Sequence, residues 1–218
     1  MLRILRLPGV FRPRSDTRLL AAVMWRQPQL RGGVALDLCT GSGFVAISAA
    51  RAGARSVTAV DRSARAVASA RLSARLNGVR VEGIVGDLLD AVPGRRFDVI
   101  TANPPYLPSD DDALPARGAA CHTEAGRDGR VLLDRLIDAA PAHLTPGGVL
   151  LVTHSSLNGE KETLERMRAA GLAPAVEERR RGPLGPLLSA RAPALERRGL
   201  LAPGEREEDL LVIAGAAR

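Results

Sequence analysis

Aromatic residues and long apolar runs are scarce in this sequence, and each scarcity excludes a class of protein. Aromatic side chains make up 2% of the 218 residues, and Tyr106 is the only tyrosine. No uninterrupted run of 18 apolar residues occurs, which argues against a transmembrane helix. The first 14 residues place arginines between leucines and lack a small-residue cleavage site, so no signal peptide is predicted. We therefore expect a cytoplasmic protein without a membrane partner.

Cysteine and histidine are too few and too scattered for a metal centre or a disulfide framework. Cys39 and Cys121 are the only cysteines, and neither they nor the three histidines follow a metal-ligand spacing. We therefore expect no bound metal. Cys39 is interpreted as a small packing residue rather than as a nucleophile.

Lysine is almost absent, although the chain is basic. Lys161 is the only lysine among 31 basic residues, and the formal net charge is +7. Arg179, Arg180 and Arg181 form the one compact basic run. Net charge informs non-specific association rather than activity, so a solvated arginine surface is favoured over nucleic-acid affinity.

Strand and helix patterns alternate from end to end, which predicts an α/β fold with a mostly parallel seven-stranded sheet and helices on both faces. The expected strands cover residues 34–38, 56–60, 79–85, 97–101, 149–153, 172–178 and 210–214. The expected helices follow the N-cap residues Ser15 and Ser63 and cover residues 43–51, 128–140 and 160–170. In the helix after Ser63, a stripe of Ala64, Ala68, Leu72 and Leu76 is expected to face the core.

The chain is predicted to form a single domain over residues 1–218, because no internal repeat and no separate linker is visible. Residues 1–30 are expected to cap the cofactor site. Residues 182–207 form a long excursion before the last strand, with four prolines and a possible short helix at 187–198. A lid over the site and a disordered surface loop are both open interpretations of this excursion.

A glycine turn joins the first central strand to its helix. Gly41 and Gly43 allow a ligand to approach the backbone closely, and the pattern also satisfies the relaxed dinucleotide fingerprint. Asp37 lies four residues before the first glycine, where its charge would crowd a pyrophosphate but attract the sulfonium and ammonium of S-adenosylmethionine. The turn therefore favours an adenosyl cofactor over a dinucleotide.

Two further acids follow neighbouring strands of the predicted sheet, at the edge where α/β folds bind ligands. Asp61 suits a bidentate hydrogen bond to ribose hydroxyls, and Asp87 suits the adenine exocyclic amine. Each acid alone is as well explained by a turn or a helix cap, but the ordered set indicates a site. The expected cofactor-binding residues from these segments are Asp37, Thr40, Gly41, Gly43, Asp61, Arg62, Asp87, Leu88 and Asn103.

The most specific motif, Asn103-Pro104-Pro105-Tyr106, directly follows the fourth expected strand. The Asn103 side-chain oxygen and the Pro104 carbonyl can each accept one N–H, which would orient a planar nitrogen toward a methyl donor. The prolines, Pro104 and Pro105, restrict the backbone, and the Tyr106 ring can stack on the acceptor or face the sulfonium. The motif predicts N-methylation with these four catalytic residues; a simple strand-ending turn is the alternative.

Together these segments resemble the HemK-like family of class I S-adenosylmethionine-dependent methyltransferases. The match covers an entry motif at residues 12–17, the glycine turn at 37–43, the unbroken motif at 103–106 and a Gly-Arg-Asp-Gly segment within 125–130. Cys39 stands where the family often has glycine. The resemblance implies a Rossmann-like fold, S-adenosylmethionine as cofactor, and a glutamine side chain of a peptide-chain release factor as acceptor. It also implies that Asp16 and Thr17 lie close to the cofactor.

The match is to the short form of the family, without the added N-terminal helical domain. That form implies a small zinc-binding activator subunit on an apolar face. Four other functions remain open from the residues alone: a nucleic-acid N6-adenine or N4-cytosine methyltransferase, a small-molecule amine or amide methyltransferase, a non-catalytic adenosyl-binding module, and a dinucleotide-dependent dehydrogenase.

Overall fold

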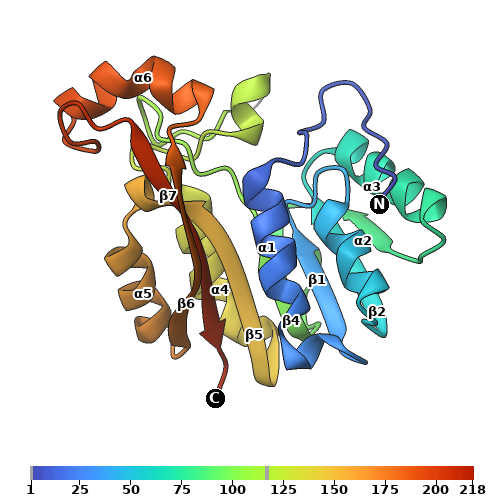
Figure 1. The fold of residues 1–218 in the computed structure, drawn as a ribbon. Helices are drawn as coiled ribbons and strands as arrows, with labels where there is room; N and C mark the ends of the chain where they lie inside the picture. Colours follow the sequence, from blue (N-terminus) through green and yellow to red (C-terminus); the bar gives the residue numbers. More distant parts are fainter. Residues whose placement is uncertain (1, 116–117) are drawn as a thin grey trace.

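The computed structural model describes residues 2–115 and 118–218. Seven strands form one sheet in the order β3-β2-β1-β4-β5-β7-β6 (Figure 1). Strand β7 runs antiparallel to β5 and β6, and the other neighbouring strands are parallel. The predicted mostly parallel seven-stranded sheet is thereby confirmed. The strands are β1 Val34–Leu38, β2 Ser56–Asp61, β3 Glu82–Val85, β4 Phe97–Ala102, β5 Leu144–Ser155, β6 Ala173–Pro183 and β7 Glu207–Ala216.

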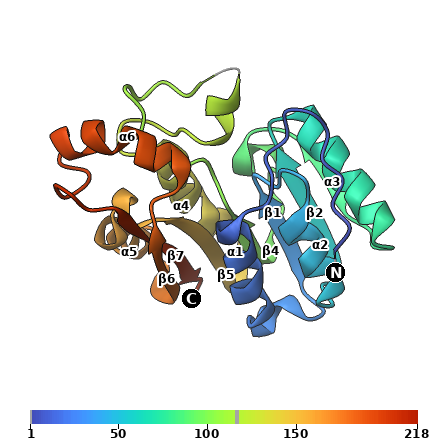
Figure 2. The ribbon, with the colours of Figure 1, turned by 45° about the horizontal axis from the view of Figure 1, so that its top comes forward.

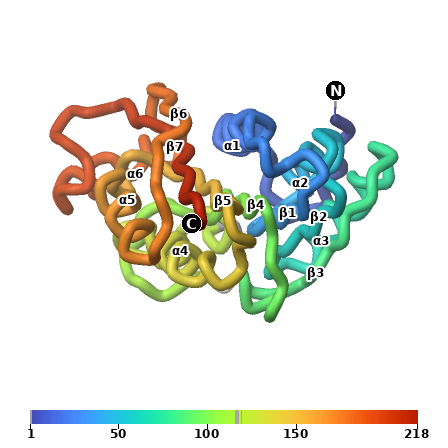
Figure 3. The backbone as a smooth tube through the Cα atoms, turned by 90° about the horizontal axis from the view of Figure 1, so that it is seen from below, coloured from blue at the N-terminus to red at the C-terminus, as the bar shows by residue number. Residues whose placement is uncertain are grey.

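Helices cover both faces of the sheet, as predicted (Figure 3). Helices α1 and α2 share one buried cluster, α4 and α5 contribute to the other, and α3 packs beside α2. The central strands are apolar on both sides: Val99 points into the first cluster and Ile100 into the second. The helices are α1 Ser15–Trp25, α2 Phe44–Arg51, α3 Ala64–Leu76, α4 Val131–His143, α5 Glu160–Ala169 and α6 Pro186–Arg197.

Some element boundaries differ from the sequence prediction by a few residues. Ser15 is the first residue of α1 rather than its N-cap, which is Arg14. The strand expected from residue 79 begins only at Glu82, and the helix expected from Asp128 begins at Val131. The Asp128 carboxylate instead accepts the Arg130 amide at 2.9 Å in the preceding turn.

Helix α3 is capped as predicted but presents a different face to the core. The Ser63 hydroxyl accepts the Ala66 amide, whereas Leu72 and Leu76 are 37% and 49% exposed, so the predicted stripe is wrong. The reason is close packing: a Cβ on Gly43 would lie 2.8 Å from the Ala70 Cα, which leaves no room for large side chains. The buried face is made of Ala66, Val67, Ser69, Ala70, Ser73 and Ala74.

The N-terminal segment lies along α3 and leads into the site. Three of its main-chain amides donate to polar side chains on the helix, at Asn77 (3.0 Å), Ser73 (2.9 Å) and Ser69 (3.1 Å). These polar side chains are buried on α3 because the extended segment satisfies them. This ladder brings Phe11 and Pro13 to the carboxyl-end edge of the sheet.

The excursion before β7 folds as a cap lobe, defined here as residues 184–206 with α6 at its centre (Figure 2). It has its own apolar cluster, to which Leu107 and Leu157 contribute from outside. Arg191 ties it to the segment after β4 by donating to the Pro108 carbonyl at 3.0 Å and pairing with Glu124. The short helix indicated at 187–198 is confirmed, one residue earlier.

No helix within the described residues combines the length and the apolar character that a membrane span requires.

Candidate active site

A large cavity of about 840 Å³ opens at the carboxyl ends of the parallel strands. Its size is within the range of about 300–1,000 Å³ that is typical of small-molecule sites. Gly43 is the one predicted site residue that does not line it. The predicted residues that do are Asp16, Thr17, Asp37, Thr40, Gly41, Asp61, Arg62, Asp87, Leu88, Asn103, Pro104, Pro105 and Tyr106.

The two glycines of the turn do different things. Both have positive φ, +54° at Gly41 and +86° at Gly43, which favours glycine at each position. A Cβ on Gly41 would meet nothing nearer than the Phe11 carbonyl at 4.0 Å, so the space on its side is open to the cavity. Gly43 instead allows α3 to approach, because a Cβ there would collide with Ala70.

Asp37 stabilises the glycine turn by hydrogen bonds. Its Oδ2 accepts the Thr40 hydroxyl at 2.6 Å and the Ala46 amide at 3.2 Å, and its Oδ1 accepts the Thr101 hydroxyl at 2.9 Å. The residue is 3% exposed, and this burial raises its pKa to about 6, against the opposing effect of the hydrogen bonds. Most of its hydrogen-bonding capacity is therefore used to hold the turn and the start of α2.

Asp61 and Asp87 stand at the ends of neighbouring strands, β2 and β3. Asp61 accepts the Gly41 amide and the Ser63 amide, each at 2.9 Å, and burial raises its pKa. Asp87 is exposed and pairs with Arg135 at 2.7 Å. Since a carboxylate has about four lone-pair sites, both acids retain acceptors for a ligand.

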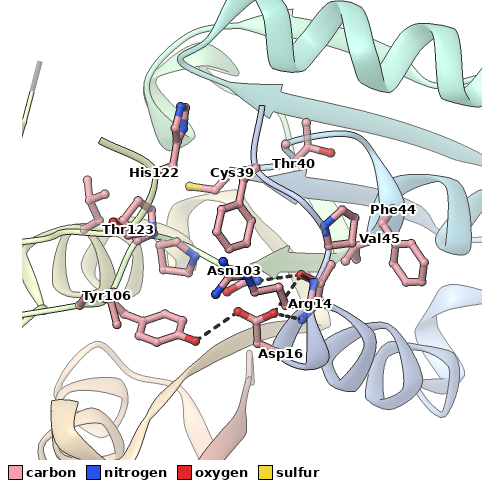
Figure 4. Close-up of a pocket in the computed structure, with 18 of the residues that line it drawn as sticks. Arg14, Asp16, Cys39, Thr40, Phe44, Val45, Asn103, Tyr106, His122 and Thr123 are labelled. Atoms are coloured by element: carbon pink, nitrogen blue, oxygen red, sulfur yellow. Dashed lines mark hydrogen bonds between the residues drawn. The ribbon is translucent and has the colours of Figure 1, made fainter. Parts of the chain in front are cut away.

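A chain of hydrogen bonds connects Asn103 to Tyr106 through the start of α1 (Figure 4). The Asn103 Nδ2 donates to the Thr17 hydroxyl at 3.2 Å, and that hydroxyl donates to Asp16 Oδ1 at 3.1 Å. The Tyr106 hydroxyl donates to the other oxygen, Asp16 Oδ2, at 3.1 Å. Asp16 and Thr17 are thus the hydrogen-bonding support of two motif residues.

This chain fixes the orientation of the Asn103 amide. Because its nitrogen is bound to Thr17, its oxygen remains the free acceptor at the end of β4. Burial and the Asp16 charge raise the pKa of Tyr106 well above its ordinary value, so its hydroxyl stays protonated and continues to donate. The site therefore holds one oriented amide oxygen beside a neutral phenol.

The far wall of the cavity comes from segments without any local sequence motif. Arg180 and Gly182 on β6, Leu187 and Leu188 on α6, and Glu208 on β7 line it together. Figure 1 shows that these segments, from the last part of the chain, meet the loop after β4 at this edge. They were missed from the sequence because only the pairing of β6 with β7 brings them to the cavity.

The basic run is largely neutralised in the fold. Arg179 pairs with Glu160 and Asp209, at 2.5 Å and 2.9 Å. Arg181 pairs with Glu207 at 2.6 Å and also approaches Glu205 and Asp209. Two of the three charges of the run are therefore compensated, whereas Arg180 lines the cavity and forms no salt bridge within the described residues.

The cavity fits an adenosyl group that carries a sulfonium. Open space beside Gly41 admits a ligand against the backbone, and Asp61 and Asp87 offer acceptors to hydroxyl and amine groups. Apolar surface for a flat ring comes from Phe11 and Leu88. The buried Ser42 hydroxyl, in the same turn, has no hydrogen-bond partner among the described residues.

Comparison with known proteins gives matches over most of the chain. The family described as "Methyltransferase small domain" matches residues 1–116. A "Putative protein N5-glutamine methyltransferase" of Methanocaldococcus jannaschii is 34% identical over 83% of this chain and 90% of its own length. The release factor glutamine methyltransferase of Bordetella pertussis is 40% identical over 67% of this chain and 57% of its own length.

Two solved structures share the arrangement of strands and helices. A structure titled as the E. cuniculi Mtq2–Trm112 complex, responsible for methylation of the termination factor eRF1, has a TM-score of 0.67, with 24% identity over 96% of this chain and 99% of that chain. A T. thermophilus 16S rRNA guanine methyltransferase with AdoMet and guanosine has a TM-score of 0.66, with 20% identity over 98% of this chain and 46% of that chain. At these identities, the likeness concerns the class I methyltransferase fold alone.

Proposed function

Since the chain belongs to the HemK-like S-adenosylmethionine-dependent methyltransferases, we propose that it methylates the side-chain amide nitrogen of a glutamine in a protein. The observation that carries this proposal is the orientation of Asn103. Its Nδ2 is held by Thr17, and its oxygen is left as an acceptor at the cavity. An amide NH₂ is a ligand that two fixed oxygen acceptors can grip by both hydrogens.

Asn103 and Pro104 provide those acceptors. An amide nitrogen is a weak nucleophile because its lone pair is delocalised into the carbonyl. The Asn103 side-chain oxygen and the Pro104 main-chain oxygen hold the two hydrogens, orient the nitrogen and stabilise the positive charge that develops on it. When bound, S-adenosylmethionine supplies an electrophilic methyl group on a sulfonium. Pro105 restricts the backbone after these two oxygen atoms. The Tyr106 ring packs against the glutamine amide that is methylated.

The cofactor side of the cavity is formed by the glycine turn and the ends of β2 and β3. Gly41 admits the ligand to the backbone, Asp61 accepts from ribose hydroxyls, and Asp87 accepts from the adenine amine. Thr40, Arg62 and Leu88 line the same part of the cavity. Asp37 and Gly43 act through the turn: the first binds Thr40, and the second admits α3.

The proposed protein acceptor is a peptide-chain release factor. Its support is that several similar proteins are described as release factor glutamine methyltransferases, although two others are described as ribosomal protein uL3 glutamine methyltransferases. A nucleic-acid acceptor is disfavoured because acidic neighbours neutralise Arg179 and Arg181. A small free amide is disfavoured because the cap lobe extends the cavity wall well beyond the space that one amide fills.

We also propose that a small zinc-binding activator subunit covers part of the surface. Leu72 and Leu76 on α3 and Val85 on the edge strand β3 are 37%, 49% and 54% exposed, and α3 packs against β3, so three of the five exposed large apolar side chains of the described residues lie on neighbouring elements. The similar Mtq2 structure was solved with Trm112. Full turnover by this chain alone would contradict this part of the proposal.

The test of the acceptor is a labelling experiment. The chain is incubated with methyl-labelled S-adenosylmethionine and an extract of the cells that encode it, and the label is located by digestion and mass spectrometry. We expect the label on the side-chain nitrogen of a glutamine in a protein. Label confined to nucleic acid or to a small molecule would overturn the glutamine acceptor.

The test of the catalytic assignment is Asn103→Ala. We expect a loss of turnover of at least about a hundredfold, as for removal of an oriented donor or acceptor at a transition state. Calorimetry should show that most of the affinity for S-adenosylmethionine is kept, since Asn103 is one of several expected cofactor contacts and the glycine turn, Asp61 and Asp87 are unchanged. A variant with normal turnover and normal cofactor binding would contradict the role of Asn103.

A further inference from the structure

Glu208 is a buried acid on the wall of the cavity, within a strand whose other acids face outward. Glu207 and Asp209 flank it, and both pair with Arg181 or Arg179 on the outer side of the β6–β7 ribbon. Side chains alternate along a strand, so Glu208 points to the opposite side. It is 8% exposed and lines the cavity.

The Glu208 carboxylate is only half satisfied within the described residues. Its Oε1 accepts the Gly185 amide at 3.2 Å. Among the described residues its Oε2 has no hydrogen-bond partner, and no salt bridge joins it to Arg180, which lines the same cavity. Buried carboxylate oxygens are normally paired because an unmet acceptor is costly, so this oxygen lacks a donor that the chain itself does not supply.

Glu208 belongs to the acceptor end of the cavity rather than to the cofactor end. It lies close enough to Tyr106 that its charge, after burial and the charge of Asp16, raises the pKa of that phenol. Gly185 and Leu188 of the cap lobe form the adjoining wall.

We propose that Glu208 is a specificity-determining residue that accepts a hydrogen bond from the main-chain N–H directly on the carboxyl side of the methylated glutamine in the acceptor polypeptide. This inference rests on the proposed function and deepens it. The glutamine side-chain amide is already held by Asn103 and Pro104, so the donor for Glu208 must come from another part of the acceptor.

A polypeptide supplies that donor at a fixed distance from the glutamine side chain. Every non-proline residue carries a main-chain N–H, and hydrogen bonds to a carboxylate are about twice as strong as those between neutral groups. The phosphate oxygens of a nucleic-acid backbone are acceptors and would be repelled. A simple primary amide without a further polar group has no second N–H group beyond the one gripped at the motif.

The experiment compares two small probes on the full chain in the presence of S-adenosylhomocysteine. N-acetylglutamine N-methylamide has a main-chain N–H on each side of the glutamine, and N-acetylglutamine methyl ester lacks the one on the carboxyl side. Binding is followed by protein-detected NMR titration. We expect the wild-type chain to bind the amide about tenfold more tightly than the ester, as is usual for a hydrogen bond to a charged acceptor.

Glu208→Gln is the test variant, because the Oε1 bond to Gly185 can be kept while a donor replaces the unpaired oxygen. We expect it to bind both probes equally, with an unchanged melting temperature and unchanged cofactor binding. Glu207→Gln, its outward-facing neighbour, is the matched control and should keep the wild-type preference. An amide-to-ester ratio that is the same in wild type and Glu208→Gln would overturn the inference. If the label is found on glutamine but the ratio is unchanged, the role of Glu208 is wrong and the proposed function is retained.

Discussion

The side-chain nitrogen of Asn158 donates a hydrogen bond of 2.7 Å to the main-chain oxygen of Tyr106, 52 residues earlier in the chain. The same nitrogen donates to the Asp128 carbonyl at 2.9 Å. Gly129 is packed against this contact, with a φ of +73° and no room for a Cβ, which would lie 2.0 Å from the Tyr106 oxygen. The Gly-Arg-Asp-Gly segment and the turn after β5 therefore hold the end of the Asn-Pro-Pro-Tyr loop.

Asn158→Asp is expected to slow methyl transfer without weakening cofactor binding. The substitution places an acceptor where two carbonyl oxygens need a donor, and losing a buried hydrogen bond costs about 1–3 kcal/mol. If that cost falls on the loop geometry, kcat should drop about 10- to 100-fold while the Kd for S-adenosylmethionine changes less than about twofold. Steady-state kinetics and calorimetry check both values.

Asn77→Asp is the matched control for that variant. Asn77 is also a buried asparagine whose nitrogen donates to two main-chain oxygens, those of Arg3 at 2.6 Å and Ser73 at 2.7 Å. It lies at the end of α3 and does not line the cavity. The control should lose stability to a similar degree and keep its kcat. Equal loss of kcat in both variants would show that Asn158 matters only for stability.

Thr17→Val should impair catalysis by releasing the Asn103 amide. Valine matches threonine in shape but removes the hydroxyl that accepts from Asn103 Nδ2 and donates to Asp16. The amide can then rotate and present its nitrogen to the acceptor, so we expect kcat to fall about tenfold. Thr17→Ser retains the hydroxyl and should retain most of the rate. Normal kcat in the valine variant would mean that Thr17 does not orient Asn103.

The sequence could predict the features that depend on neighbouring residues. The helix cap at Ser63 depends only on a hydrogen bond from the Ala66 amide, three residues later in the chain. The choice of glycine at position 41 is explained by the positive φ of that residue alone. Asp61, Asp87 and Asn103 were expected at one edge because parallel strands place their carboxyl ends together. The structure brings all three to the same cavity.

The features that the sequence could not predict depend on packing between distant segments. The face of α3 that is buried is determined by its close approach to Gly43, where only small side chains fit. The apolar stripe with Leu72 and Leu76 does not reveal this contact. Asn158 and Glu208 belong to no local motif. Their roles arise only when the turn after β5 meets Tyr106 and when β7 pairs with β6.

Cys39→Gly should be more stable than Cys39→Ala. Cys39 has a φ of +54°, a left-handed conformation that costs a residue with a Cβ about 1–2 kcal/mol. Cys39→Ala keeps the Cβ and removes only the sulfur, so the glycine and alanine variants together isolate the backbone effect. We expect the glycine variant to melt about 2–4 °C above the alanine variant, which is the shift for about 1 kcal/mol in a chain of this size. Thermal denaturation checks this, and equal melting temperatures would rule out backbone strain at Cys39.

Asp37→Asn should change how stability depends on pH. Burial raises the pKa of Asp37 from 3.8 to about 6, so between these values the folded protein binds more protons than the unfolded chain. Stability then falls as the pH rises through this window and stays lower above it. A shift of this size corresponds to about 3 kcal/mol at neutral pH.

The asparagine variant can keep the fold because the Thr101 hydroxyl can reverse its role. That hydroxyl lies 3.3 Å from the Leu36 carbonyl, so it can donate there and accept from the new side-chain amide. The variant loses the titrating group at position 37, while Asp61 titrates in both proteins. The melting temperature of the variant relative to wild type should therefore rise by about 5 °C or more between pH 4 and pH 7, since about 3 kcal/mol is at stake. A difference that is constant with pH would mean that Asp37 titrates as it does in the unfolded chain.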